Sequence, residues 1–169
     1  PVVNKHGETC TVSLTNLDIH DIARVCRTYG LARYYLVTPL QDQQELAGRL
    51  LRHWNEDGPG GEANATRAQA IERVRVLSDL QQAVTDIRER CGQEPFLAAT
   101  SARDEGSATP GDIRRLLRER PVMLLLGTGH GLAREVLERA DDLLRPIRPF
   151  GEYRHLSVRS AAAITIDRI

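Results

Sequence analysis

Three glycines alternate in a short segment near the C-terminal end of the chain, at Gly127, Gly129 and Gly131. A continuous apolar run at residues 122–126 precedes them, and an amphipathic run begins at Leu132. A buried strand, a glycine turn and a helix in this order let backbone N–H groups face a bound ligand. The pattern therefore predicts a ligand-binding loop.

A second glycine-centred loop follows about twenty residues later, at residues 149–153, and leads into a helix of small residues. His130 falls in the first of these loops and His155 at the end of the second. Either histidine can be a loop residue without a chemical role. Two ligand-facing loops so close to the C-terminus leave little room for a conventional nucleotide-binding fold.

Other chemistries fit the sequence poorly. A dinucleotide fingerprint requires G-x-G-x-x-G, whereas Leu132 stands where its third glycine would fall, and the loop follows the last long strand rather than the first. The G-x-S-x-G elbow of hydrolases is missing from the sequence. The five histidines and three cysteines have no metal-ligand spacing, so no metal is expected.

The composition is that of an ordinary globular domain. The chain has 169 residues, of which 41% are hydrophobic and 27% charged, and no apolar run approaches the 18 residues of a membrane span. The scattered, odd number of cysteines favours a reducing cytoplasmic location. The net charge is zero, yet 22 of the 23 basic residues are arginine. GC-rich coding is the simpler explanation of this bias, and RNA binding through arginine–phosphate contacts stays open.

Strand and helix patterns alternate along the chain, which predicts an α/β fold with a parallel sheet flanked by helices. We expect one domain over residues 1–169, with an exposed loop insertion at residues 55–65. Asn16 and Asp18 are suitable caps for the first helix, and Thr109 for a later one. The expected strands are 34–38, 74–77, 96–100 and 122–126, and the expected helices are 19–29, 42–54, 66–73, 79–91, 112–120 and 157–169.

Three segments together resemble the motifs of the knotted SPOUT RNA methyltransferases, in particular SpoU-type enzymes. Residues 16–30 resemble the first motif, with Arg24 as its arginine and Gly30 as its glycine, although Asp18 replaces the usual asparagine. Gly129, Gly131 and Leu132 match the G-x-G-L of the second motif, with Thr128 in place of glutamate. Gly151 and the run H-L-S-V-R at residues 155–159 match the spacing of the third motif. The last third of the chain also resembles a bacterial branch of this superfamily.

The resemblance implies a deep C-terminal trefoil knot whose loops hold S-adenosylmethionine. A side chain at the loop glycines would keep the backbone away from that cofactor, and Leu126, Ile147 and Leu156 would form apolar walls for its adenine ring. The residues implied to bind it are Thr100, Ser101, Leu126, Gly127, Gly129, His130, Gly131, Ile147, Gly151, His155, Leu156 and Ser157.

Arg24 matches the catalytic arginine of SpoU-type relatives. It would act as a base on a ribose hydroxyl or, equally well, hold an RNA phosphate, and its helix position is also consistent with a surface ion pair to Asp21 or a nearby glutamate. The departures at Asp18, Thr128 and Ser157 leave ribose and base methylation of tRNA or rRNA both open. The resemblance also implies a homodimer formed through the knot and the C-terminal helix.

Two other functions stay open from the sequence. A knotted module that binds cofactor or RNA without transferring a methyl group would explain the departures from the motifs and the zero net charge. An unrelated nucleotide-binding enzyme would explain the glycine loop alone.

Overall fold

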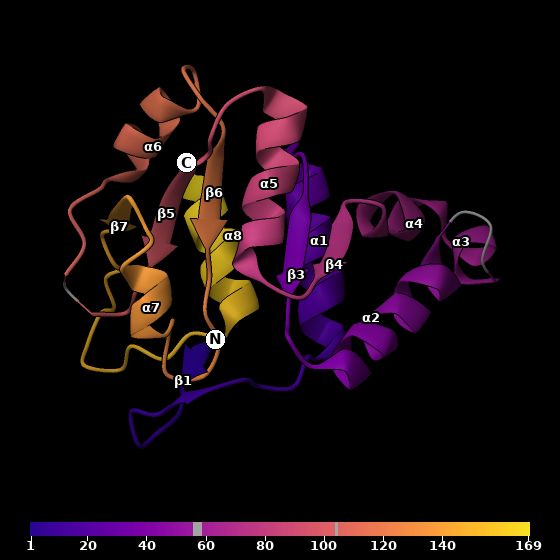
Figure 1. Cartoon of the computed structure of the whole chain (residues 1–169), viewed down its shortest axis with the longest axis horizontal. Helices are drawn as coiled ribbons and strands as arrows, with labels where there is room; N and C mark the ends of the chain where they lie inside the picture. The colour runs from indigo at the N-terminus through magenta and orange to yellow at the C-terminus, as the bar shows by residue number, and fades with distance from the viewer. Residues whose placement is uncertain (56–58, 104) are drawn as a thin grey trace. The chain divides into compact units, whose positions relative to one another are not determined.

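The computed structural model describes residues 1–55, 59–103 and 105–169. Within the stretch expected to be a single domain it contains two compact units: unit 1 comprises residues 1–12 and 84–169, and unit 2 comprises residues 13–83. The elements labelled in Figure 1 are, in chain order, β1 (Val2–Val3), β2 (Thr9–Cys10), α1 (Asn16–Thr28), β3 (Tyr34–Val37), α2 (Gln41–Trp54), α3 (Pro59–Ala63), α4 (Ala65–Ile71), β4 (Val74–Leu77), α5 (Leu80–Cys91), β5 (Phe96–Thr100), α6 (Pro110–Leu116), β6 (Val122–Leu125), α7 (Arg134–Leu137), β7 (Asp142–Leu144) and α8 (Val158–Arg168).

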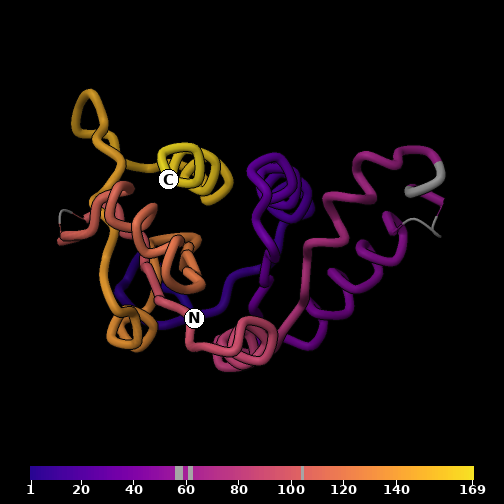
Figure 2. The backbone as a smooth tube through the Cα atoms, turned by 90° about the horizontal axis from the view of Figure 1, so that it is seen from above, coloured from indigo at the N-terminus to yellow at the C-terminus, as the bar shows by residue number. Residues whose placement is uncertain are grey.

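Unit 1 is built on a parallel sheet in the order β6–β5–β7. β5 is the central strand, and its residues 97–99 are buried, as expected for a strand covered on both faces. Figure 2 shows α8 on one side of these strands and α5 with α7 on the other. Ala98, Ile113 and Leu144 form a core cluster against which Ile169 packs. An antiparallel hairpin, β1–β2, completes unit 1.

Unit 2 contains a two-stranded parallel sheet, β3–β4, joined through α2, α3 and α4. α1 begins after Thr15, whose hydroxyl accepts the N–H of Asp18, so Thr15 is the cap rather than Asn16 or Asp18. The buried face of α1 comprises Ile19, Ile22, Ala23 and Cys26. Ile19 and Ala23 pack with residues of β3, α2, α4 and β4 in one core.

The predicted α/β class with parallel strand pairs is confirmed, but the strands of the two units form separate sheets among the described residues. The expected exposed loop at 55–65 is wrong for Pro59–Ala63, which forms α3. Gly60 in that helix is buried, and a Cβ there would lie 2.6 Å from the Trp54 ring, so the missing side chain allows this close packing. Residues 56–58 of the expected loop lie outside the described residues.

The segment after the glycine loop also differs from expectation. The amphipathic run predicted from Leu132 forms only the four-residue helix α7, and the chain then enters β7. β7 is hidden in the sequence because it is short and opens with Asp142. In the described part of the chain, no helix is long and apolar enough to cross a membrane.

Candidate functional site

The C-terminal ends of three parallel strands meet at one edge of the unit 1 sheet. The register pairs Ala99 with Leu125 and Thr100 with Leu144. The connections that follow β5, β6 and β7 therefore begin beside one another. We call them the first loop (residues 101–109, of which 104 is not described), the second loop (126–133) and the third loop (145–157). Open α/β sheets bind their ligands at this edge.

The residues predicted to bind the cofactor all lie on these loops or on the strand end that precedes them. Thr100 ends β5, and Ser101 opens the first loop. The second loop carries Leu126, Gly127, Gly129, His130 and Gly131, and the third carries Ile147, Gly151, His155, Leu156 and Ser157. The structure thus brings these three segments to one edge, while the contact of each residue with a cofactor stays a prediction.

The second loop folds tightly back on itself. A Cβ at Gly127 would lie 2.7 Å from the backbone nitrogen of Leu132 and 2.9 Å from the carbonyl carbon of Gly131. Gly129 and Gly131 have φ values of +62° and +105°, which side chains rarely permit. The N–H of Gly131 donates to the carbonyl of Thr128 at 3.2 Å. Gly127 is therefore required by the loop itself, a different reason from the cofactor approach that the sequence suggested.

The N-terminal strand β1 holds the second loop from the opposite side to β2. Val3 donates its N–H to the carbonyl of Gly131 at 3.0 Å and accepts the N–H of His130 at 3.1 Å. Ala133 donates to the carbonyl of Pro1 at 3.2 Å, and Val2 forms an antiparallel bridge with Leu132. This contact is not predicted from the sequence. Its only trace in the sequence is the β-branched pair Val2-Val3, which is too short to name a partner.

Three of the predicted cofactor residues use their hydroxyl groups locally. Thr100 donates to the carbonyl of Leu125 at 3.0 Å, which ties the ends of β5 and β6 together. Ser101 accepts the N–H of Arg103 at 3.1 Å. Ser157 caps α8 by accepting the N–H of Ser160 at 3.2 Å. These contacts give each hydroxyl a role in shaping its loop.

The third loop is the most exposed part of the edge. Gly151, His155 and Leu156 are all exposed, and the ring of Tyr153 meets that of His155 edge-on at 5.4 Å between centroids. Leu126 and Ile147 are half-buried, as expected for apolar walls, but Leu156 is 50% exposed. Phe150 is fully exposed. Within a single chain, Leu156 therefore does not line an enclosed cavity.

The first loop is fastened to β7. Ala108 donates to the carbonyl of Leu143 at 3.0 Å and accepts the N–H of Arg145 at 2.8 Å. The hydroxyl of Ser107 donates to the carboxylate of Asp142 at 2.8 Å. A Cβ at Gly106 would lie only 2.2 Å from the carbonyl oxygen of Leu144. The chain leaving β7 thus passes directly against the first loop.

Arg24, the predicted catalytic residue, lies on the exposed side of α1 in unit 2. No carboxylate among the described residues forms an ion pair with it, so the surface pair with Asp21 is not what holds it. Asp18, at the position of the motif asparagine, accepts a hydrogen bond from the hydroxyl of Thr15 at 2.5 Å. That departure from the motif therefore has a helix-capping role.

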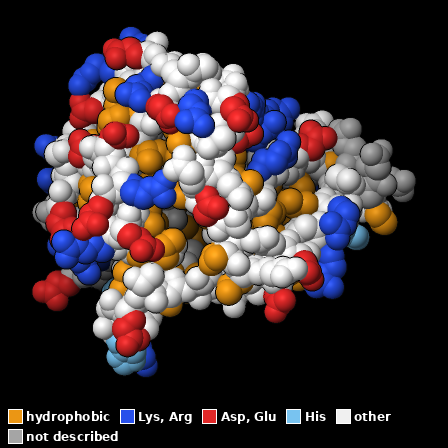
Figure 3. All heavy atoms as spheres, in the orientation of Figure 1, with side chains coloured by type: hydrophobic (Ala, Val, Ile, Leu, Met, Phe, Trp, Pro, Cys, Tyr) orange, Lys and Arg blue, Asp and Glu red, His pale blue; other side chains and the backbone are white. Residues whose placement is uncertain are grey.

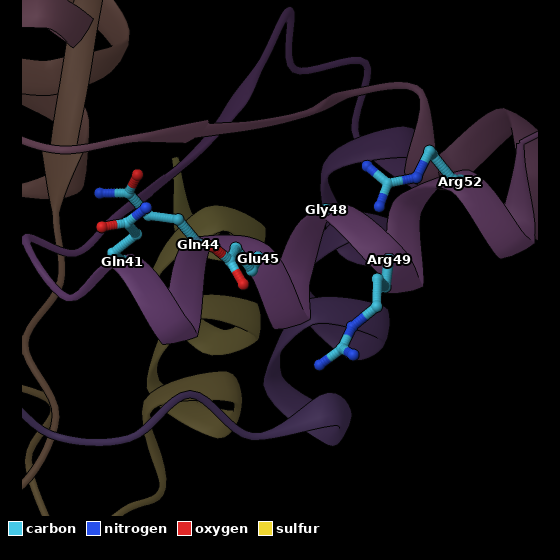
Figure 4. Close-up of a pocket in the computed structure, with 6 residues that line it drawn as sticks. All are labelled: Gln41, Gln44, Glu45, Gly48, Arg49 and Arg52. Atoms are coloured by element: carbon cyan, nitrogen blue, oxygen red, sulfur yellow. The ribbon is translucent and has the colours of Figure 1, made fainter.

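A separate hollow of about 460 Å³ lies on α2 of unit 2 and contains none of the predicted site residues. Figure 4 shows its lining side chains along one face of this helix. They are Gln41, Gln44, Glu45, Gly48, Arg49 and Arg52. The hollow is open and polar, unlike the largely apolar pockets that enclose small ligands.

The edge of unit 1 fits a ligand that is held by backbone groups. At Gly131 and Gly151, a Cβ would meet nothing within 4 Å, so the backbone there is open on the side that a side chain would cover. Half-buried Leu126 and Ile147 add apolar surface on two of the loops. This combination suits an adenosyl group, which needs apolar walls and backbone partners for its base. In the described residues, no group of three or more His, Cys, Asp or Glu side chains could hold a metal ion.

The family model described as SAM-dependent RNA methyltransferase matches residues 1–169. A protein of Oleidesulfovibrio alaskensis named tRNA (guanine-N(1)-)-methyltransferase is 55% identical over 169 residues, which is 100% of this chain and 40% of that protein. The chain thus spans two fifths of the length of this relative. A protein of Aquifex aeolicus that is named only as uncharacterized is 34% identical over 174 residues, covering 100% of this chain and 83% of its own length.

Solved methyltransferase structures share the fold. A probable methyltransferase from Bordetella pertussis Tohama I matches with a TM-score of 0.62 and 21% identity, over 89% of this chain and 85% of its own. The SpoU methyltransferase AviRb from Streptomyces viridochromogenes, in complex with the cofactor AdoMet, matches with a TM-score of 0.62 and 16% identity, over 92% of this chain and 53% of its own. The match of the family model to the whole chain shows that this chain belongs to the family of S-adenosylmethionine-dependent RNA methyltransferases, with an α/β fold similar to that of the SPOUT enzymes.

Proposed function

We propose that this chain transfers a methyl group from S-adenosylmethionine to RNA, with the cofactor bound by the three loops at the carboxyl edge of β6–β5–β7. The observation that carries this proposal is the convergence of the loops after Thr100, Leu125 and Leu144, one of which is the tight glycine loop. The family match supports the same chemistry.

Each loop has a defined task in this proposal. S-adenosylmethionine supplies an electrophilic methyl group when it is bound. The second loop presents backbone N–H and C=O groups to it, and its conformation is fixed by Gly127 and by β1. Leu126 and Ile147 contact the adenine ring, and the exposed third loop, with His155 and Leu156, covers the cofactor.

Arg24 acts on the RNA rather than on the cofactor. Its guanidinium is exposed and has no carboxylate partner in the described residues, so it is available to hold a phosphate or to orient the acceptor. The substrate is tRNA or rRNA, and the acceptor is a ribose hydroxyl or a base atom. We put tRNA first because the Oleidesulfovibrio relative is named for it, although the guanine N1 specificity in that name belongs to a protein more than twice as long.

The test is transfer of a tritiated methyl group from S-adenosylmethionine to total RNA from a bacterial strain that lacks the gene. We expect label in RNA with the wild-type chain and little with Arg24→Ala, while the affinity for S-adenosylhomocysteine stays unchanged. Nuclease digestion of the labelled RNA then identifies the nucleotide and the modified atom. Failure of the wild-type chain to bind S-adenosylmethionine or S-adenosylhomocysteine at millimolar concentration would refute the proposal.

The kinetics of Arg24→Lys separate the two roles open to the arginine. If Arg24 holds a phosphate, lysine keeps the charge and mainly raises the KM for RNA. If Arg24 removes a proton, kcat falls while KM for RNA changes little. Cofactor binding without any transfer would instead favour a binding module, the alternative prompted by Asp18, Thr128 and Ser157.

The proposal includes a trefoil knot made by the last third of the chain. The support is the close passage of the segment after β7 against the first loop, where Gly106 leaves no room for a Cβ beside Leu144. The backbone bonds of Ala108 with Leu143 and Arg145 hold that crossing in place. A crystal structure with S-adenosylhomocysteine tests both the path of the chain and the bound loops.

The proposal also includes a homodimer formed through the third loop and α8. Phe150 is fully exposed and Tyr153 is 78% exposed on that loop. Two neighbouring aromatic side chains expose apolar surface to water, which is unfavourable unless a partner covers them. We therefore expect a dimer in sedimentation experiments and a shift toward monomer in a Phe150→Ser, Tyr153→Ser double variant. A wild-type monomer at micromolar concentration would contradict this part. We place the enzyme in the cytoplasm, where its RNA substrate is made.

A further inference from the structure

A row of arginines follows the contact between α1 and α4 in unit 2. Arg24 and Arg27 are exposed on α1, and half-buried Arg67 faces them from α4. The Nη2 of Arg27 lies 3.5 Å from the Oε1 of Gln69, which links the two helices. We call the group of His20, Arg24, Arg27, Arg67 and Gln69 the α1–α4 seam.

One carboxylate of α1, that of Asp21, borders this seam. At 100° per residue, His20, Arg24 and Arg27 lie within about 60° of one another around α1. Asp21 lies about 60° from Arg24 around α1, one turn away from it, whereas Asp18 lies about 160° from His20. α4, with the sequence ATRAQAI, has no acidic residue. No described carboxylate forms an ion pair with any of the three arginines. Basic and acidic side chains are otherwise interspersed, as on the face in Figure 3.

His20 reports the positive potential at the seam. Burial lowers the pKa of its imidazole, and the charge of Arg67 lowers it further; Asp21 opposes this shift and Arg24 adds to it. The Nδ1 of His20 is buried and has no hydrogen-bond partner in the described structure. Two guanidinium groups on different helices therefore lie close enough to act on one imidazole.

Arg67 is held in place before any ligand arrives. Its guanidinium carbon lies 4.4 Å above the centre of the Trp54 ring, and the ring of His20 packs edge-on against the same indole at 5.4 Å. Stacking of this kind restricts the arginine while leaving its N–H donors free to bind, so less entropy is lost when a phosphate is contacted.

We propose that the α1–α4 seam binds consecutive phosphates of the RNA substrate, with Arg27 and Arg67 extending the contact that begins at Arg24. This inference rests on the proposed function and adds the surface along which the RNA lies. Arginine suits the task because its planar fork donates two hydrogen bonds to one phosphate. RNA is favoured over an acidic protein because the family acts on RNA.

The salt dependence of RNA binding tests this inference. The probes are bulk bacterial tRNA and a ribosomal RNA transcript, measured by fluorescence anisotropy with the full chain over a range of salt concentrations. The affinity for RNA falls as salt rises. Removal of one arginine that binds a phosphate should make the negative slope of log K against log salt shallower by roughly one. We expect Arg27→Ala and Arg67→Ala each to make the slope shallower by that amount, and the double variant by about twice as much.

Three controls accompany these variants. Arg27→Lys and Arg67→Lys keep the charge and should keep most of the slope, which separates loss of charge from loss of folding. Arg88→Ala removes an exposed arginine of unit 1 that pairs with Glu94 at 3.1 Å, and it should leave the slope unchanged. Binding of S-adenosylhomocysteine should be the same in all variants.

The possible outcomes separate the seam from the proposed function. If both alanine variants behave like Arg88→Ala while the wild type still methylates RNA, the seam proposal is overturned and the function stands. A wild type that binds neither RNA probe also overturns the seam. Absence of cofactor binding overturns the function itself.

Discussion

The backbone of Val3 is hydrogen-bonded in both directions to the glycine loop, through its N–H to the carbonyl of Gly131 at 3.0 Å and through its carbonyl to the N–H of His130 at 3.1 Å. A Cβ at Gly129 would lie 3.3 Å from the same Val3 carbonyl. The loop that is proposed to hold the cofactor is therefore shaped by residues more than a hundred positions earlier in the chain.

Replacing Val3 with proline should weaken cofactor binding because proline cannot donate to Gly131. The loss of one hydrogen bond, about 1 kcal/mol, corresponds to roughly fivefold weaker binding of S-adenosylhomocysteine, measured by calorimetry. Lys5→Pro is the matched control. Lys5 is the second residue of the turn closed by Gly7 and Asn4, where proline is favoured, so the affinity should not change. Equal affinities in wild type and Val3→Pro would argue against a role for β1.

Gly127→Ala and Gly151→Ala should separate loop geometry from ligand contact. The alanine at position 127 meets the backbone of Leu132 and Gly131, and we expect it to lower the free energy of unfolding by about 1–3 kcal/mol. The alanine at position 151 has open space and should leave stability unchanged. Thermal denaturation of both variants measures the change in stability. If Gly151→Ala still loses cofactor affinity, its Cβ occupies the ligand's place, whereas unchanged affinity would remove Gly151 from the site.

The three cysteines should differ in reactivity. Cys26 is 3% exposed, and burial raises the pKa of its thiol to about 11, so at pH 8 it stays protonated and unreactive. Exposed Cys91 should react quickly with a disulfide reagent at that pH, and all three thiols should react after denaturation. The number of thiols that react quickly in the native protein should be the same in a Cys26→Ser variant. Fast reaction of all three thiols in the native chain would show that the α1 core opens readily.

Thr109 caps α6 in a reciprocal arrangement with Asp112, and Thr109→Ala should cost about 1 kcal/mol of stability. Hydrogen bonds from Thr109 lower the pKa of the Asp112 carboxyl, aided by Arg115. The stabilisation from Asp112 is thus present above its unfolded pKa and is lost as the pH falls through its lower folded pKa. In denaturant unfolding, the difference in the free energy of unfolding between the wild type and Thr109→Ala should be smaller in acid than at pH 7. Thr109→Ser keeps the hydroxyl and should resemble the wild type.

Local patterns in the sequence predict much of this fold. The strand at Phe96–Thr100 coincides with the prediction because it is a continuous buried run between breakers. The predicted helix cap at Thr109 is confirmed, because the residues that form a cap lie within four positions of one another in the sequence. β7 escapes prediction because only three residues form it and its first is Asp142, which pairs with β5 across more than forty residues.

The candidate site likewise has a part that local sequence patterns predict and a part that they do not. Glycine spacing points correctly to a tight loop at residues 127–131, because positive φ values and close backbone approaches leave few other choices. The support of that loop by β1 and the local use of the Ser157 hydroxyl depend on distant or capping partners, which spacing does not encode. The α1–α4 seam likewise combines side chains about forty residues apart.

The central position of β5 has a consequence for how the protein is made. Its neighbours β6 and β7 are translated after it, and the carbonyls of Arg168 and Ile169 accept hydrogen bonds from Arg114, so the end of α8 is also needed to complete unit 1. Contacts of long sequence separation form slowly, and an unpaired β5 is prone to aggregate in the meantime. We therefore expect the nascent chain to depend on chaperones until synthesis has passed Ile169.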